Sequence, residues 1–158
     1  MNNPVWIDDK GKIVEPEYCR DFLSRHPMRC INDRFYTVDG QLPDENKLKR
    51  TIYEEISPWL HAKAAQTVEQ VIKALKLAAY ADPLPLQCDR IHVANGTYFL
   101  DGTFTEEKEY CSNRLPVSYQ TEAPAPEQWL RFLSELLEPE DIPTLQEYLG
   151  YCLIPSTK

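Results

Sequence analysis

The chain has 158 residues, of which 42% are hydrophobic and 11% aromatic, and it carries a net charge of −8. A chain of this length buries about 70% of its unfolded surface on folding, which fits one domain with a hydrophobic core and excludes a disordered protein. The sequence contains no apolar stretch long enough to cross a membrane and no signal-peptide pattern at its start. We therefore expect a cytoplasmic protein without a membrane partner.

Charge is distributed unevenly along the chain. Residues 1–81 hold 12 acidic and 12 basic side chains, whereas residues 82–158 hold 13 acidic and 5 basic ones. Because the second part repels a phosphate backbone, nucleic-acid contact is expected to come from the first part.

The first predicted elements are a helix and a hairpin. The helix runs from Glu15 to the pair at residues 26–27, because a proline lies near its first turn and acidic residues lie at its positive end. Residues 28–38 combine aromatic and β-branched side chains with turn signals, which predicts two short strands.

Two amphipathic helices are predicted next. Asp44 offers an N-cap to the first, and Pro58 predicts that this helix kinks or ends near Ile56. The second is predicted over residues 67–80, with residues 67–70 as a capping box.

The second part of the chain begins with hairpin signals. Residues 91–100 place the pair Asn95-Gly96 between β-forming residues, which predicts a hairpin whose turn is that pair. Residues 101–102 predict another turn, and residues 115–119 are expected to add an edge strand.

Two further helices are predicted at the C-terminal end. The first follows residue 126 and presents a broad apolar surface that we expect to be well buried, and the second lies near residues 142–151. The predicted core consists of Leu48, Ile52, Ile56, Val71, Ile72, Leu75, Val93, Phe99, Trp129, Leu133, Leu136, Leu145 and Leu149.

These elements predict an α+β fold that is mostly helical, with small antiparallel β-hairpins. We expect residues 1–158 to form a single domain with two parts, 1–81 and 82–158. Two helices followed by a hairpin are also the order of a winged-helix module, in which a helix enters the major groove of DNA. Winged-helix-like elements are therefore an open alternative.

The sequence holds no Walker A loop, dinucleotide fingerprint, nucleophile elbow or zinc-protease motif, so it predicts no catalytic residue and no cofactor bound by this chain. Five scattered cysteines without an export signal are interpreted as reduced thiols. Two sets of soft ligands lack the paired spacing of a tetrahedral metal site, so no metal is predicted. These sets are Cys19, His26 and Cys30, and Cys88, His92 and Cys111. A small enzyme with a Cys/His pair stays open as a separate hypothesis.

Basic side chains on the two central helices are candidates for phosphate contacts. Acidic residues lie between them, so a solvated helix face is the competing interpretation. The same choice applies to a looser cluster of four arginines over residues 20–34. The DNA-contact candidates are Lys47, Lys49, Arg50, Lys73, Lys76 and Arg114.

Four segments occur in the order of a known protein region: residues 91–96, 113–119, 126–133 and 145–153. This region resembles the domain that precedes the helicase in phage, plasmid and poxvirus-type primase-helicases of superfamily 3. The aromatic hairpin near residues 35–36, followed by two helices, is similar as well.

The resemblance implies a non-catalytic N-terminal domain from a phage or mobile-element DNA replication protein, which assists helicase assembly and positions DNA. It implies a parent protein that is an ATP-dependent DNA helicase and self-associates as a hexamer. ATP and Mg²⁺ are then expected in a helicase domain that follows this chain, and DNA is a partner through the parent protein. The alternative is a stand-alone winged-helix-type DNA-binding domain.

Overall fold

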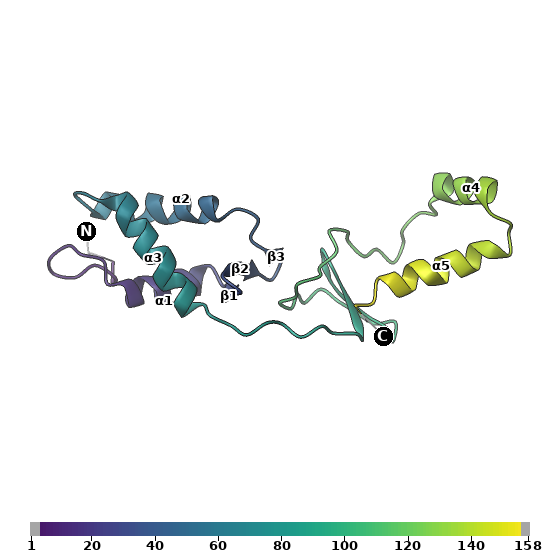
Figure 1. Cartoon of the computed structure of the whole chain (residues 1–158), viewed down its shortest axis with the longest axis horizontal. Coiled ribbons are helices and arrows are strands. Elements are labelled where there is room, and N and C mark those ends of the chain that lie inside the picture. Colours follow the sequence, from purple (N-terminus) through teal and green to yellow (C-terminus); the bar gives the residue numbers. More distant parts are fainter. Residues whose placement is uncertain (1–3, 156–158) are drawn as a thin grey trace. The chain divides into compact units, whose positions relative to one another are not determined.

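The computed structural model describes residues 4–155, and the chain divides into two compact units, Met1–Leu84 (unit 1) and Pro85–Lys158 (unit 2) (Figure 1). Within the described residues, five α-helices accompany two antiparallel three-stranded sheets, so the predicted α+β class is confirmed. Whether the two units make up a single domain stays a prediction. None of the helices in this stretch is long and apolar enough to span a bilayer.

Unit 1 begins with the predicted helix and hairpin. Helix α1 (Glu15–Arg25) has a proline in its first turn, which suits the unpaired N–H groups at a helix start. Asn32 and Asp33 form the hairpin turn with φ angles of 49° and 64°, the left-handed values that a two-residue turn of this kind requires. The sheet has one strand more than predicted; its strands are β1 (Arg29–Ile31), β2 (Arg34–Thr37) and β3 (Gly40–Gln41).

Helix α2 (Glu45–Ile56) begins and ends where the sequence predicts. The Asp44 carboxylate accepts a hydrogen bond from the backbone N–H of Asn46 at 2.8 Å, which satisfies one free donor of the first turn. The helix ends in a short 3-10 turn, η1 (Ser57–Trp59), because Pro58 has no N–H to continue the α-helical pattern.

Helix α3 (Ala64–Ala78) starts before the predicted residue 67, and the capping-box prediction is wrong. The helix is preceded by Lys63, whose φ angle is 61°. Thr67 lies inside the helix, where its hydroxyl donates to the Lys63 carbonyl at 3.1 Å. Threonine hydroxyls inside helices often bond to the preceding turn in this way, so the side chain is not available as a cap.

The core of unit 1 lies between α1, α2 and α3. Trp6 meets Tyr18 edge to face at 5.1 Å between ring centroids, and Tyr18 stacks on Phe22 at 5.8 Å. All the predicted core residues of this unit are buried: Leu48, Ile52, Ile56, Val71, Ile72 and Leu75. The helical spacing of apolar residues therefore identified the buried faces correctly.

Unit 2 is built around a sheet of three strands, β4 (Arg90–Val93), β5 (Gly96–Phe99) and β6 (Phe104–Thr105). The predicted hairpin between β4 and β5 is confirmed, as is the turn at residues 101–102. Val93 of this unit's predicted core is buried, whereas Phe99 is only half-buried.

The turn of this hairpin differs from the prediction by one residue. Val93 pairs with Gly96, so the turn residues are Ala94 and Asn95 rather than Asn95 and Gly96. A Cβ atom at Gly96 would overlap the backbone carbonyl oxygen of Thr105, which lies on the neighbouring strand β6. Glycine is needed at this position because a second backbone passes so close to it.

Residues 115–119 follow the edge of β4 without forming a strand, so the predicted edge strand is wrong. The Leu115 N–H donates to the His92 carbonyl at 2.8 Å, and the Ala94 N–H donates to the Val117 carbonyl at 2.9 Å. These two hydrogen bonds do not continue into a regular pairing with β4, so the segment remains irregular.

The two C-terminal helices, α4 (Glu127–Leu136) and α5 (Asp141–Cys152), are confirmed as elements and form a helical hairpin (Figure 1). Their predicted burial is wrong. Leu133 is buried, but the predicted core residues Trp129, Leu136 and Leu149 are exposed and Leu145 is half-buried. Helical spacing gathers apolar residues on a face, but it does not supply a partner to cover that face.

The predicted winged-helix order is present in the chain but is divided between the units. Helices α2 and α3 belong to unit 1, whereas the β4–β5 hairpin belongs to unit 2. Neither unit by itself therefore forms a winged-helix module from these elements.

Candidate functional site

Two of the predicted DNA-contact lysines lie in ion pairs between helices α2 and α3. The Lys49 Nζ is 2.9 Å from a Glu69 oxygen, and the Lys76 Nζ is 2.9 Å from a Glu45 oxygen. These hydrogen bonds raise the pKa of both lysines. Each amine already has a carboxylate beside it, so it offers a phosphate less charge than an unpaired lysine would.

The other candidates of unit 1 differ in their surroundings. Arg50 forms an exposed ion pair with Glu54 on the same helix, at 2.8 Å. Lys47 on α2 and Lys73 on α3 are exposed, and among residues 4–155 neither has a carboxylate within ion-pair distance. Of the lysines and arginine proposed on α2 and α3, these two keep their charge unpaired.

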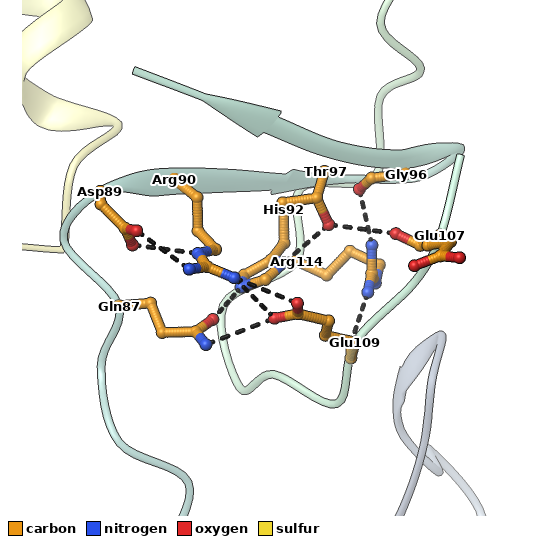
Figure 2. Close-up of polar contacts among 9 residues, drawn as sticks. All are labelled: Gln87, Asp89, Arg90, His92, Gly96, Thr97, Glu107, Glu109 and Arg114. Atoms are coloured by element: carbon orange, nitrogen blue, oxygen red, sulfur yellow. Dashed lines mark hydrogen bonds and ion pairs between the residues drawn. The ribbon is translucent and has the colours of Figure 1, made fainter. Parts of the chain in front are cut away.

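Arg114, the candidate in unit 2, binds backbone carbonyl groups. Its Nη1 donates to the carbonyl oxygens of Val93 at 2.6 Å and Gly96 at 3.1 Å, and its Nη2 donates to that of Glu109 at 2.8 Å. Figure 2 shows the guanidinium between the β4–β5 hairpin and the segment that carries Glu109. This side chain ties the hairpin to the following segment, and its contact with DNA stays a prediction.

His92 lies at the centre of the polar contacts in unit 2 (Figure 2). Its Nε2 is 2.8 Å from the Gln87 Oε1, and the Gln87 amide donates to Glu109. Its Nδ1 is 3.3 Å from the Thr97 hydroxyl, which also donates to the Glu107 carbonyl at 3.2 Å. Burial and, to a smaller extent, the charge of Arg114 lower the pKa of His92. With both ring nitrogens used and a side chain 2% exposed, His92 stabilises the fold rather than meeting a substrate.

A pocket of about 410 Å³ opens in unit 1 between the end of α1, the end of β2, the segment from β3 to α2 and the start of α2. We call it the α1–α2 pocket. The buried side chains of Phe22 and Leu48 form its floor, and exposed basic side chains surround its mouth. These basic residues are Arg25, His26 and Lys47.

The charge of Arg25 is compensated inside unit 1. Its guanidinium donates to Glu55 at 2.8 Å and to Asp21 at 2.9 Å, and the Tyr18 hydroxyl donates to the same Glu55 carboxylate at 2.9 Å. The hydrogen bonds from Arg25 lower the pKa of Glu55, while burial raises the pKa of Tyr18. Lys47 is therefore the lining residue whose positive charge has no carboxylate of the described residues paired with it, and the Asp44 carboxylate also lines the pocket.

The soft-ligand residues do not assemble into a metal or catalytic site. Cys19, Cys30 and Cys111 are buried, and this burial raises the pKa of each thiol, so the thiols stay protonated. All five cysteines are free. In the described stretch 4–155, no cluster of three metal-ligating side chains is found, and no cysteine is hydrogen-bonded to a histidine.

Helices α4 and α5 carry a large exposed apolar surface. Trp129 and Phe132 stack at 5.6 Å between ring centroids and are 45% and 50% exposed. If about half of each side chain faces solvent, these residues together expose on the order of 700 Å² of apolar area. This α4–α5 apolar surface consists of Trp129, Leu130, Phe132, Leu136, Tyr148, Leu149, Tyr151 and Leu153.

Sequence reasoning found the lysines but missed the pocket beside one of them. The pocket is formed by residues from separate segments between Phe22 and Thr51, which share no local pattern. Lys47 is among the predicted DNA contacts and Arg25 belongs to the looser arginine cluster, and in both cases the signal is charge. The sequence also identifies the apolar residues of α4, but it predicts that they are buried in the core rather than exposed on a surface.

A family model described as "D5 N terminal like" matches residues 17–138, from α1 through α4 and across both units. The chain therefore belongs to the D5 N-terminal-like family, the domain that precedes the helicase in primase-helicases of phages and poxviruses. The predicted resemblance is confirmed, although the segment 145–153 lies outside the matched residues. No curated protein matches the chain.

Proposed function

We propose that this chain is a non-catalytic N-terminal domain of a replicative helicase, which assists helicase assembly and positions DNA. The family match over residues 17–138 carries the proposal, because domains of this family form the N-terminal part of primase-helicase proteins. In this proposal the parent is an ATP-dependent superfamily 3 helicase of a phage or mobile element. ATP and Mg²⁺ act in its helicase domain rather than on this chain.

The assembly role is supported by the α4–α5 apolar surface. A stable interface buries about 800 Å² on each partner, and the exposed apolar area of these helices is of that order. A groove of about 400 Å³ lies between the two helices and is lined by residues such as Trp129, Leu133 and Leu145. Apolar side chains of a partner can bind in this groove. A second copy of the chain is the occupant that a self-associating helicase requires.

Self-association tests this role. Sedimentation velocity over a concentration series is expected to show reversible association of the chain. The double variant Trp129→Ser, Leu149→Ser is expected to raise the dissociation constant at least about tenfold, which corresponds to about 1.4 kcal/mol. Leu77→Ser is the matched control, because Leu77 is 81% exposed but lies on α3.

The outcomes separate a surface role from a folding role. Circular dichroism must show that the double variant keeps the helical content of the parent chain. A chain that stays monomeric at every concentration, or a double variant that associates as the control does, would contradict the assembly role.

The DNA-positioning role is supported by the unpaired lysines of unit 1. Lys47 and Lys73 lie on adjacent helices, α2 and α3, in the part of the chain without net negative charge. Their binding to phosphates releases counterions, so affinity must fall as salt rises. Fluorescence anisotropy of labelled oligothymidine, titrated at increasing salt, measures this. Absence of binding at low salt would refute the DNA role.

A further inference from the structure

We infer that the α1–α2 pocket of unit 1 receives an unpaired base of single-stranded nucleic acid, with the neighbouring phosphate at Lys47. The inference rests on the proposed DNA-positioning function and makes it more specific. It assigns a ligand class, a nucleotide within a single strand, to a defined pocket.

The shape and polarity of the pocket fit a nucleic-acid base. Its volume of about 410 Å³ lies in the range of small-ligand sites, about 300–1,000 Å³. Phe22 and Leu48 are buried beneath the pocket, and the partly buried Met28 and Leu42 provide its accessible apolar walls. Proteins hold unpaired bases in pockets lined by apolar side chains of this kind.

The charge at the mouth also favours a nucleotide. Lys47 lines the pocket directly before Leu48 on α2, and no carboxylate of the described residues lies within ion-pair distance of it. Asp44 lines the pocket as well, but its carboxylate accepts a hydrogen bond from the Asn46 N–H at the start of α2. Arg25 is held by Asp21 and Glu55, so it adds little net attraction. A ligand with an apolar group and an adjacent negative charge would place the apolar group in the pocket and the charge next to Lys47.

An exposed aromatic ring lies at the edge of the pocket. The His26 ring lies 4.7 Å from the Phe22 ring, centroid to centroid, and is exposed to solvent, whereas Phe22 is buried beneath it. An imidazole held in this way provides a surface on which a base can stack.

These features favour a single strand over a duplex. In a duplex each base is paired and stacked, so its face cannot enter a pocket. In a single strand every nucleotide brings a base with an accessible face and, next to it, a charged phosphate. An acidic peptide with an aromatic side chain is the competing ligand.

Methyl NMR provides a direct probe of the pocket. The chain has two methionines, and one of them, Met28, lines the pocket. With ¹³C-methyl-labelled methionine, the Met28 signal is identified by its loss in Met28→Leu. Oligothymidine is expected to shift this signal, and the same sequence in a duplex is expected to leave it unchanged.

A charge-reversal pair tests the role of Lys47. Lys47→Glu is expected to weaken oligothymidine binding about tenfold and to abolish the Met28 shift. Lys10→Glu is the matched control, because it makes the same change in net charge at an exposed site of unit 1 outside the pocket. It is expected to change the affinity less than about twofold.

Each outcome has a defined meaning. Oligothymidine binding that leaves Met28 unchanged, or that Lys47→Glu and Lys10→Glu weaken equally, would overturn the pocket assignment while leaving DNA positioning intact. No binding at low salt would overturn both. A Met28 shift with poly-glutamate peptide containing tyrosine, but not with oligothymidine, would assign the pocket to a peptide instead.

Discussion

The two units of this chain are stabilised in different ways. Unit 1 buries a continuous cluster of fourteen residues, mostly aromatic and aliphatic, between α1, α2 and α3. In the described part of unit 2, the buried apolar side chains are only Val93, Cys111 and Leu133, and the polar side chains of His92 and Thr97 are buried with them. The apolar residues of α4 and α5 are instead largely exposed.

Unit 2 relies on hydrogen bonds from side chains to the backbone. The Asn95 side chain donates to the Tyr119 carbonyl at 2.9 Å and accepts from the Tyr119 N–H at 2.8 Å, while Arg114 binds three carbonyl groups. Such contacts fix the position of irregular segments without burying much apolar area. The two units contain similar fractions of apolar residues. In unit 1 these residues form a closed core, whereas in unit 2 many of them remain exposed on α4 and α5.

The largest expected effect is on the core of unit 1. Ile52→Ala removes a fully buried side chain and leaves a cavity, so it is expected to lower the free energy of unfolding of unit 1 by about 4 kcal/mol. Urea titrations followed by amide NMR signals of each unit measure the effect separately. Leu77→Ala, at an exposed position, should change it little, and a small effect of Ile52→Ala would contradict the closed-core description.

A smaller effect is expected where two strands of unit 2 approach each other. Gly96→Ala places a Cβ against the Thr105 carbonyl, so it is expected to destabilise unit 2 by about 3 kcal/mol and to leave unit 1 unchanged. Gly150→Ala is the control, because its Cβ meets open space within α5. That control should instead stabilise the helix by about 0.5–1 kcal/mol, and equal effects of the two variants would refute the close approach.

The contribution of Arg114 is expected to be smaller again. Arg114→Met keeps the aliphatic stem but loses the bonds to the carbonyls of Val93, Gly96 and Glu109, which should destabilise unit 2 by about 2 kcal/mol. Chemical denaturation measures this loss of stability. The control is Arg131→Met, which removes an exposed ion pair with Glu135 and should have a negligible effect. If Arg114→Met lowered DNA affinity without lowering stability, a direct DNA contact would replace the structural role.

The smallest effect is a difference in acid sensitivity between the units. Burial lowers the pKa of His92, so unfolded unit 2 binds a proton that the folded unit resists, and stability falls as pH drops below the usual histidine value of about 6.5. The pKa of Glu55 in unit 1 is lowered by Arg25, and this contribution is lost only as pH falls below about 4.3.

The urea midpoint of unit 2 should therefore decline between about pH 7 and pH 5 while that of unit 1 stays constant. His92→Gln should remove most of this slope. Midpoints that decline together in both units would show that another group governs the acid response.

Much of the fold followed from local sequence patterns. Helices α1, α2, α4 and α5 and both hairpins lie where periodicity, proline positions and turn residues predict them. The errors arose where a local signal competed with a contact. Thr67 bonded to its own preceding turn instead of capping α3, and Gly96 was fixed by its closeness to Thr105 rather than by a turn.

The candidate site was predictable only in part. A sequence shows which residues are lysines. Whether a carboxylate neutralises a lysine depends on which helices pack together, as in the ion pair between Lys49 and Glu69. The α1–α2 pocket could not be predicted, because residues from α1, the end of β2, the segment after β3 and α2 meet there only after folding.

The sequence by itself determined the helices, the hairpins, the family and the uneven charge, because these depend on residues close together in the chain or on their order along it. Only the tertiary structure decided which apolar faces are covered and which cations are paired. Burial and ion pairing depend on distances between segments that are remote in sequence. Ile52 and Trp129 both occupy apolar helical positions, yet one is buried in a core and the other lies on a surface.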